Sequence, residues 1–147
     1  MSVEIIGMIG VQREGTGAKG TEVHVIGGGI DPDYIVQFAQ AHEESGFDKA
    51  LVGYTSTSAD GFAVAMHAAA HTTNLGYLIA HRAGFMAPTM AARHAATLDQ
   101  LTGGRIALHV ITGGSDEEQR RDSDWLDHDS RYRRTDEFME VLRRVWT

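Results

Sequence analysis

Four apolar runs of strand length alternate with four segments of helical spacing along this 147-residue chain. Each connection between successive runs is long enough to carry a crossover helix and to join parallel strands. The runs that predict strands are 3–9, 49–54, 75–80 and 105–112. This alternation predicts an α/β fold with a parallel sheet. Two architectures fit it: an open doubly wound sheet, or half of a (β/α)8 barrel, which typically needs about 250 residues.

Local signals indicate where the helices begin. Asp31 followed by Pro32 combines an N-cap with a proline at the first helical position. Ser58 is expected to cap the second helix, Pro88 to open the third, and Ser130 to begin the last. The apolar residues expected to face inward on the second and third helices are Phe62, Met66, Ala69, Met90, Ala91, Ala95, Leu98 and Leu101.

The stretch 97–115 contains the strongest indication of a site. Gly103 stands where a helix C-cap favours left-handed backbone. The following run, 105–112, is apolar apart from His109, which predicts a strand buried on both faces. The polar turn after it would open from the carboxyl end of this strand, where α/β proteins bind their ligands. Thr112 and His109 are therefore candidates to line a pocket, although His109 could equally be a buried structural residue.

Composition limits the class of protein. A chain of this length forms a single domain of 1–147, and its net charge of −7 argues against a nucleic-acid-binding face. No signal peptide or run of membrane-spanning length is apparent, so we expect a cytoplasmic protein. The glycine-rich tract 13–29 is expected to be a mobile loop. Its segment 15–20 matches a dinucleotide fingerprint in form, but an extended run follows it where the fingerprint requires a helix.

Two further pairs of residues are candidates for ligand contacts. His81 and Arg82 follow the third predicted strand, either as an exposed loop pair or as a pocket wall with a cation for an anionic ligand. His128 and Tyr132 are four apart at a predicted helix start, where free backbone N–H groups attract anions. The alternative for this second pair is that Ser130 is a simple cap and Tyr132 belongs partly to the core.

His67 and His71 have a spacing that could hold a metal on one helix face. No third ligand is evident, and His71 near a helix C-terminus is also favoured by the helix dipole. No Ser–His–Asp arrangement or catalytic carboxylate pair stands out in the sequence.

Two segments resemble a known family. AARHAATLDQLTGGRIALHVITGG (91–114) and LDHDSRY (126–132) are similar to the bacterial luciferase-like flavin monooxygenases, in particular to their alkanesulfonate monooxygenase branch. The patterns that carry the likeness are AARxAATLDxLxxGR, VxTGxxxE and LDHxxRY. The likeness extends from about residue 5 to 146 and is strongest over 88–132.

The resemblance implies a (β/α)8 TIM barrel, of which this chain covers about the first four β/α units. It also implies reduced FMN as cofactor, supplied by a separate NAD(P)H-dependent flavin reductase, and oxidation of a small organic substrate by O2 through a flavin peroxide. His109 and Thr112 would then lie against the isoalloxazine ring. His128 and Tyr132 would contact the ribityl-phosphate tail, and Ser58 would lie near the flavin.

Gln12, His81 and Arg82 would face the substrate. The chain departs from the branch at three of the flavin and substrate positions named so far. Gln12 stands where sulfonate oxidisers have His, Ser58 replaces Cys, and His109 replaces Asn. The substrate is therefore a sulfonate or another small organic molecule. The principal catalytic residues are expected in the second half of the family's barrel, beyond the part that this chain covers.

The resulting expectation is a two-component, FMN-dependent monooxygenase. A half barrel leaves two strand edges open, so a homo-oligomer is expected. Two alternatives stay open: a flavin-binding half-barrel module without catalysis, and a metal-dependent barrel hydrolase that uses His67 and His71.

Overall fold

The computed structural model describes residues 3–12 and 29–147, so the glycine-rich tract predicted to be mobile lies outside the described residues except for Gly29. The elements are β1 (Ile6–Met8), α1 (Pro32–Glu44), β2 (Lys49–Val52), α2 (Gly61–Ala69), β3 (Gly76–Arg82), α3 (Pro88–Thr102), β4 (Ile106–Ile111), α4 (Asp116–Arg121) and α5 (His128–Val145). In this described part, no helix is both long and apolar enough to cross a membrane.

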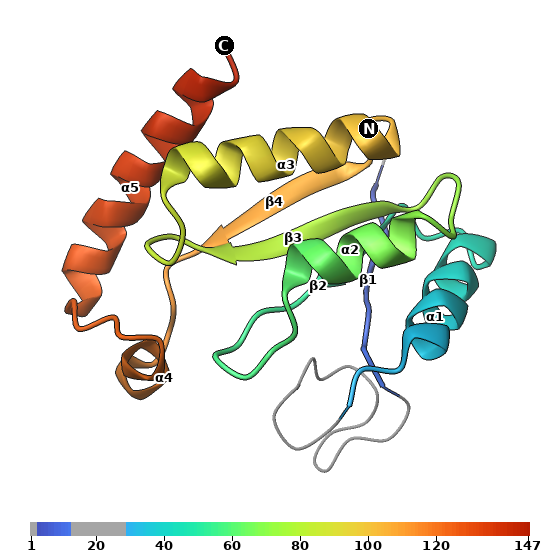
Figure 1. Cartoon of the computed structure of the whole chain (residues 1–147), viewed down its shortest axis with the longest axis horizontal. Coiled ribbons are helices and arrows are strands. Elements are labelled where there is room, and N and C mark those ends of the chain that lie inside the picture. Colours follow the sequence, from blue (N-terminus) through green and yellow to red (C-terminus); the bar gives the residue numbers. More distant parts are fainter. Residues whose placement is uncertain (1–2, 13–28) are drawn as a thin grey trace.

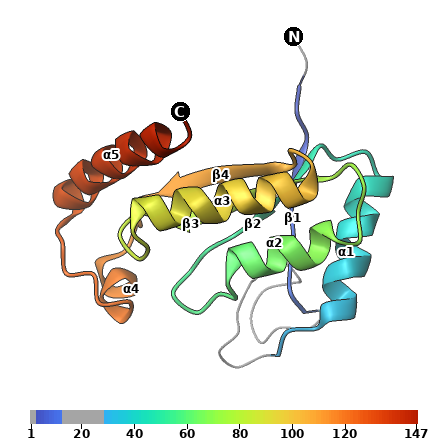
Figure 2. The same ribbon diagram turned by 45° about the horizontal axis from the view of Figure 1, so that its top comes forward.

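The four strands form one parallel sheet in the order β1-β2-β3-β4. Helices α1, α2 and α3 lie next to one another along the same face of this sheet (Figures 1 and 2). A doubly wound sheet would reverse its strand order and carry helices on both faces. Winding in one direction with helices on one face is instead the pattern of a barrel wall. The prediction of a parallel sheet built from four β/α units is therefore confirmed.

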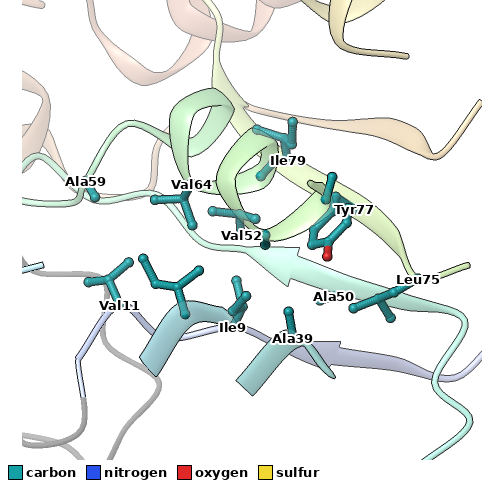
Figure 3. Packing of buried hydrophobic residues seen from close by; sticks show 14 of the residues in the cluster. Ile9, Val11, Ala39, Ala50, Val52, Ala59, Val64, Leu75, Tyr77 and Ile79 are labelled. Atoms are coloured by element: carbon teal, nitrogen blue, oxygen red, sulfur yellow. The ribbon is translucent and has the colours of Figure 1, made fainter. Parts of the chain in front are cut away.

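The main core lies between the sheet and the first two helices, as Figure 3 shows. Val52, Tyr77 and Ile79 project from β2 and β3, while Val64 and other small residues of α2 cover them. These side chains are almost completely buried. Burying an aliphatic side chain of this size contributes about 1.5–3 kcal/mol, so this interface supplies much of the free energy of folding.

The predicted helix faces are partly wrong. Met66, Met90 and Leu101 are exposed by 37%, 37% and 66% instead of facing inward. The helices approach the sheet through small residues such as Ala65 and Ala91, which are fully buried. The largest apolar residues therefore do not identify the packed face. Met66 and Leu101 line a surface groove between α2 and α3.

The predicted helix starts are confirmed at two sites and wrong at two. Asp31 caps α1, accepting a hydrogen bond from the backbone N–H three residues on at 3.0 Å, and α3 begins at Pro88. For α2, Asp60 is the cap and Ser58 is not. For α5, Asp127 is the cap in place of Ser130, so this helix begins two residues earlier.

Strand β4 differs from its prediction. The expected burial on both faces is wrong: most β4 residues are half-buried and His109 is exposed. Among the described residues only β3 pairs with β4, so the outer edge of β4 has no covering strand. The chain after it contains helix α4, which was not among the four helices predicted from the sequence.

Glu43 links the end of α1 to the loop before β3 through hydrogen bonds. Its carboxylate accepts the backbone N–H groups of Thr73 (2.9 Å), Asn74 (2.5 Å) and Leu75 (2.8 Å). Burial alone would raise the pKa of this carboxyl, but these hydrogen bonds outweigh burial and lower it. A lowered pKa means that the charged form stabilises the fold.

We therefore expect Glu43→Ala to lower the free energy of unfolding by about 1–3 kcal/mol, because hydrogen bonds to a charged acceptor are lost. The loss should be full at neutral pH and shrink as the pH falls below about 4, where the carboxyl of the unfolded chain protonates. Urea unfolding at pH 7 and at pH 3 measures both effects. Glu44→Ala, at an exposed neighbouring position, is the matched control. Equal stability of the two variants at pH 7 would contradict the anchoring role.

Candidate active site

A cleft of about 750 Å³ opens at the carboxyl ends of β3 and β4. The first turns of α5 close its other side, where α5 runs beyond the ends of these strands in Figure 1. The lining residues are Tyr54, Arg82, His109, Val110, Ile111, Thr112, Gly113, Gly114, Glu118, His128, Tyr132, Thr135, Asp136 and Met139. A cleft of this size accepts a cofactor or small organic molecule, and its position is the one predicted for a site on a parallel sheet.

Strand register brings two of the lining residues together. His109 of β4 is in register with Ala80, and Arg82 lies two residues further along β3. Side chains two apart on a strand share a face, so His109 and Arg82 lie on the same side of the sheet. Leu108 and Val110, the neighbours of His109, pack against the helices on the opposite side.

The turn after β4 provides a rigid polar corner. Gly113 has a φ of +86°, and a Cβ there would lie 1.9 Å from Nε2 of the fully buried Gln119. Glycine is therefore required at this position. Within the described part of the chain, the Thr112 hydroxyl and the His109 imidazole make no hydrogen bond with another side chain or backbone group. Both groups can thus serve a ligand in the cleft.

The start of α5 supplies an aromatic pair. The rings of His128 and Tyr132 lie 4.9 Å apart at an angle of 46°. The prediction that they share a helix face at an N-terminus is confirmed. Tyr132 is 54% exposed, so the alternative that it belongs partly to the core is wrong. The pair presents an imidazole and a phenol to the cleft.

Arg82 is buried at the end of β3 and carries the ionic contacts of the site. Its Nη2 lies 2.7 Å from Oε1 of Glu118, and its Nη1 lies 3.4 Å from Oδ2 of Asp122. Its guanidinium carbon lies 4.6 Å from the ring centre of Tyr54 and 5.2 Å from that of Phe85. The sequence predicted a cation here. It did not predict the two carboxylates that pair with Arg82, which belong to Glu118 on α4 and to Asp122 just after that helix.

Tyr54 and Glu118 are lining residues that the sequence analysis missed. Burial, with the charge of Asp122, raises the pKa of the Tyr54 phenol, so this group ionises even less readily than an ordinary tyrosine. Glu118 belongs to α4, a helix that was not predicted from the sequence. A signal for it was present, because Ser115 and Glu118 have the spacing of a capping box, and Ser115 caps α4 in the structure.

His81 does not share the cleft wall with Arg82. Adjacent strand residues face opposite sides, and the His81 ring lies 5.6 Å from each of Phe62 and Phe138 among the helices. Burial lowers the pKa of His81, so this imidazole is neutral at pH 7. Both residues belong to β3 and neither forms an exposed loop pair.

Ser58 and Gln12 also lie outside the lining of the cleft. The Ser58 hydroxyl accepts the backbone N–H of Thr55 at 2.7 Å. The same loop reaches the cleft wall through Ser56, whose N–H donates to Glu118 at 2.8 Å. Gln12 is half-buried after β1. A contact of Ser58 with flavin, or of Gln12 or His81 with substrate, stays a prediction.

His67 of α2 and His71, just after that helix, make local contacts. Their rings lie 5.1 Å apart, Nε2 of His67 is 3.1 Å from the carbonyl oxygen of Pro32, and Nδ1 of His71 is 2.9 Å from that of His67. In the described ranges, 3–12 and 29–147, no three His, Cys, Asp or Glu residues gather in a way that could hold a metal ion.

Comparison with solved structures shows similar folds. A long-chain alkane monooxygenase (LadA) is 25% identical with a TM-score of 0.72, over 80% of this chain and 32% of that one. DmoA from Hyphomicrobium sulfonivorans is 27% identical with a TM-score of 0.65, over 76% and 29%. The oxygenating constituent of 3,6-diketocamphane monooxygenase from the CAM plasmid of Pseudomonas putida, in complex with FMN, is 16% identical with a TM-score of 0.74, over 98% and 40%. This last likeness shows the fold alone.

The chain thus spans about a third of the length of these proteins. It corresponds to the N-terminal part of their TIM barrels. Residues 8–147 match the sequence profile of the family described as luciferase-like monooxygenase. Because that match covers nearly the whole sequence, this chain belongs to the luciferase-like monooxygenase family.

Proposed function

We propose that this chain forms part of a reduced-FMN-dependent monooxygenase that uses O2 to oxidise a small organic substrate. One observation carries the proposal. His109 and Thr112 from β4, and His128 and Tyr132 from α5, line the same cleft although up to 23 residues separate them. These are the four lining residues that the family resemblance assigns to the flavin.

The chemistry of the cleft fits FMN. A flavin has a flat ring with hydrogen-bonding edges and a phosphorylated tail. The hydroxyl of Thr112 and the imidazole of His109 are available for the ring, and the exposed aromatic pair on α5 is available for the tail. The N-terminus of α5 also favours a phosphate, because its backbone N–H groups carry partial positive charge.

The residues of the cleft would bind and orient the cofactor, while reduced FMN, when bound, supplies the electrons that activate O2. Thr112 would fix one edge of the ring from the rigid turn that Gly113 provides. Tyr54 and Met139 add apolar surface to the lining of the cleft.

Two partners follow from the same proposal. An NAD(P)H-dependent flavin reductase would supply the reduced FMN, as the family resemblance implies. The second partner that we propose is another copy of this chain, as expected from the sequence.

A flavin-binding module without catalysis is the second candidate, and the half-exposed β4 beside the cleft favours it. Oxygen transfer distinguishes the two. With reductase, NADH and isotopically labelled O2, a monooxygenase transfers label to one of a panel of alkanes, ketones, sulfides and sulfonates. A protein that binds reduced FMN but labels no compound would be the module.

Thr112→Val removes the hydroxyl and keeps the shape of the side chain. We expect reduced FMN to bind about five- to tenfold more weakly, because one buried hydrogen bond is lost. Anaerobic absorbance titration measures the affinity. Thr97→Val, on an exposed position of α3, is the control and should bind as the wild type does. Unchanged affinity of Thr112→Val would exclude contact between this hydroxyl and the flavin.

His128→Ala tests the end of the cleft proposed for the phosphate. We expect it to weaken the binding of reduced FMN by about tenfold and that of reduced riboflavin by less, since riboflavin lacks the phosphate. The same titration with both flavins provides the comparison. His71→Ala alters an exposed histidine at the end of α2, outside the cleft, and should change neither affinity. An equal loss for the two flavins would show that His128 does not contact the phosphate.

A further inference from the structure

The charges around Arg82 do not favour an anionic group of a substrate at that part of the cleft. Of the described residues that line it, Arg82 is the one with a permanent positive charge. Glu118 contributes a carboxylate to the same lining, and Oδ2 of Asp122 lies 3.4 Å from the guanidinium. Carboxylates therefore outnumber the cation at this end of the site.

The positive charge of Arg82 is already paired. The side chain is 1% exposed, and its two terminal nitrogens face Glu118 and Asp122 at 2.7 and 3.4 Å. The rings of Tyr54 and Phe85 lie within cation–π distance of the guanidinium. A sulfonate or carboxylate that bound to Arg82 would lie close to these two carboxylates. Charges of like sign repel strongly where little water screens them.

The two carboxylates are themselves held in place. Oε1 of Glu118 accepts the N–H of Ser56 at 2.8 Å in addition to its bond with Arg82. The hydroxyl of Tyr54 lies 3.4 Å from Oδ2 of Asp122. The start of helix α4 is also held by an ion pair, because its first residue, Asp116, lies 2.8 Å from the buried Arg131. A ligand cannot displace the carboxylates by moving one free side chain.

We propose that the cleft selects an uncharged organic substrate over an anionic one. Glu118 and Asp122 are the residues that determine this specificity, through their pairing with Arg82. The inference rests on the proposed function for the identity of the site and extends it to the class of substrate. Specificity arises here from a repulsive element as much as from an attractive one. Neutral compounds are therefore better candidates for the substrate than sulfonates.

The test compares hexanesulfonate with hexanol, which have the same alkyl chain and differ in charge. NMR titration of the 147-residue chain follows the backbone amides of Gly113 and Gly114. In the variant Glu118→Gln with Asp122→Asn, both partners of Arg82 lose their negative charge but keep an oxygen that can accept a hydrogen bond. We expect the affinity for hexanesulfonate to rise by about tenfold, because the guanidinium can now form a charge-assisted hydrogen bond with the anion. The affinity for hexanol should stay within about twofold.

Glu117→Gln is the matched control. Glu117 is on the same helix, but its side chain is 83% exposed and pairs with Arg121, away from Arg82. It should leave both affinities unchanged. Removal of two charges beside a buried cation can destabilise a fold, so the single variant Glu118→Gln is measured as well, and circular dichroism establishes that each sample is folded. Glu118→Gln alone should give a smaller gain in affinity for hexanesulfonate than the double variant.

Two results would overturn the inference: tighter binding of hexanesulfonate than hexanol by the wild type, or no gain for the sulfonate in either variant. Titration of the same samples with reduced FMN separates this inference from the proposed function. A chain that gains sulfonate binding but does not bind FMN keeps the charge assignment and loses the flavin proposal. A chain that binds FMN but shows no gain in affinity for hexanesulfonate keeps the flavin proposal and loses the charge assignment.

Discussion

Parallel pairing wound in one direction is the constraint on which the site depends. Because each strand returns to the same end through a helix on the same face, the carboxyl ends of β2, β3 and β4 meet at one edge of the sheet. Tyr54, Arg82 and Thr112 each follow or end a different strand, yet they line one cleft. The close packing of α2 on the sheet through Val64 and alanines keeps those ends in register. The site is thus built at the ends of strands whose other residues pack in the main core.

Buried arginines connect the short helix α4 to this scaffold. Arg82 reaches it from β3, and Arg131 reaches it from α5. A buried guanidinium is costly unless its hydrogen bonds are satisfied, so each arginine fixes the position of the carboxylates that it meets. The same contacts that position α4 therefore set the charge of the cleft, and structure and specificity depend on the same residues.

The family relationship and the geometry of the cleft point to the same chemistry by separate routes. The match over 8–147 establishes a luciferase-like monooxygenase chain, but family membership leaves the substrate open. The local geometry addresses what the family does not: Arg82 is neutralised within the site, and the polar groups of the described lining include the Thr112 hydroxyl, the Tyr132 phenol and the imidazoles of His109 and His128. A flavin and an uncharged substrate together fit this distribution.

The sequence by itself determined the order of strands and helices, the cap at Asp31 and the left-handed glycine at 103, which has a φ of +73°. These features depend on interactions within about one helical turn, so neighbouring residues are enough to predict them. Only the tertiary structure decided that Met66 faces solvent and that Arg82 pairs with carboxylates 36 and 40 residues away. The packed face of a helix and the partner of a buried charge are selected by distant segments. The local sequence pattern does not show which distant segment will pack against a given helix or pair with a given charge.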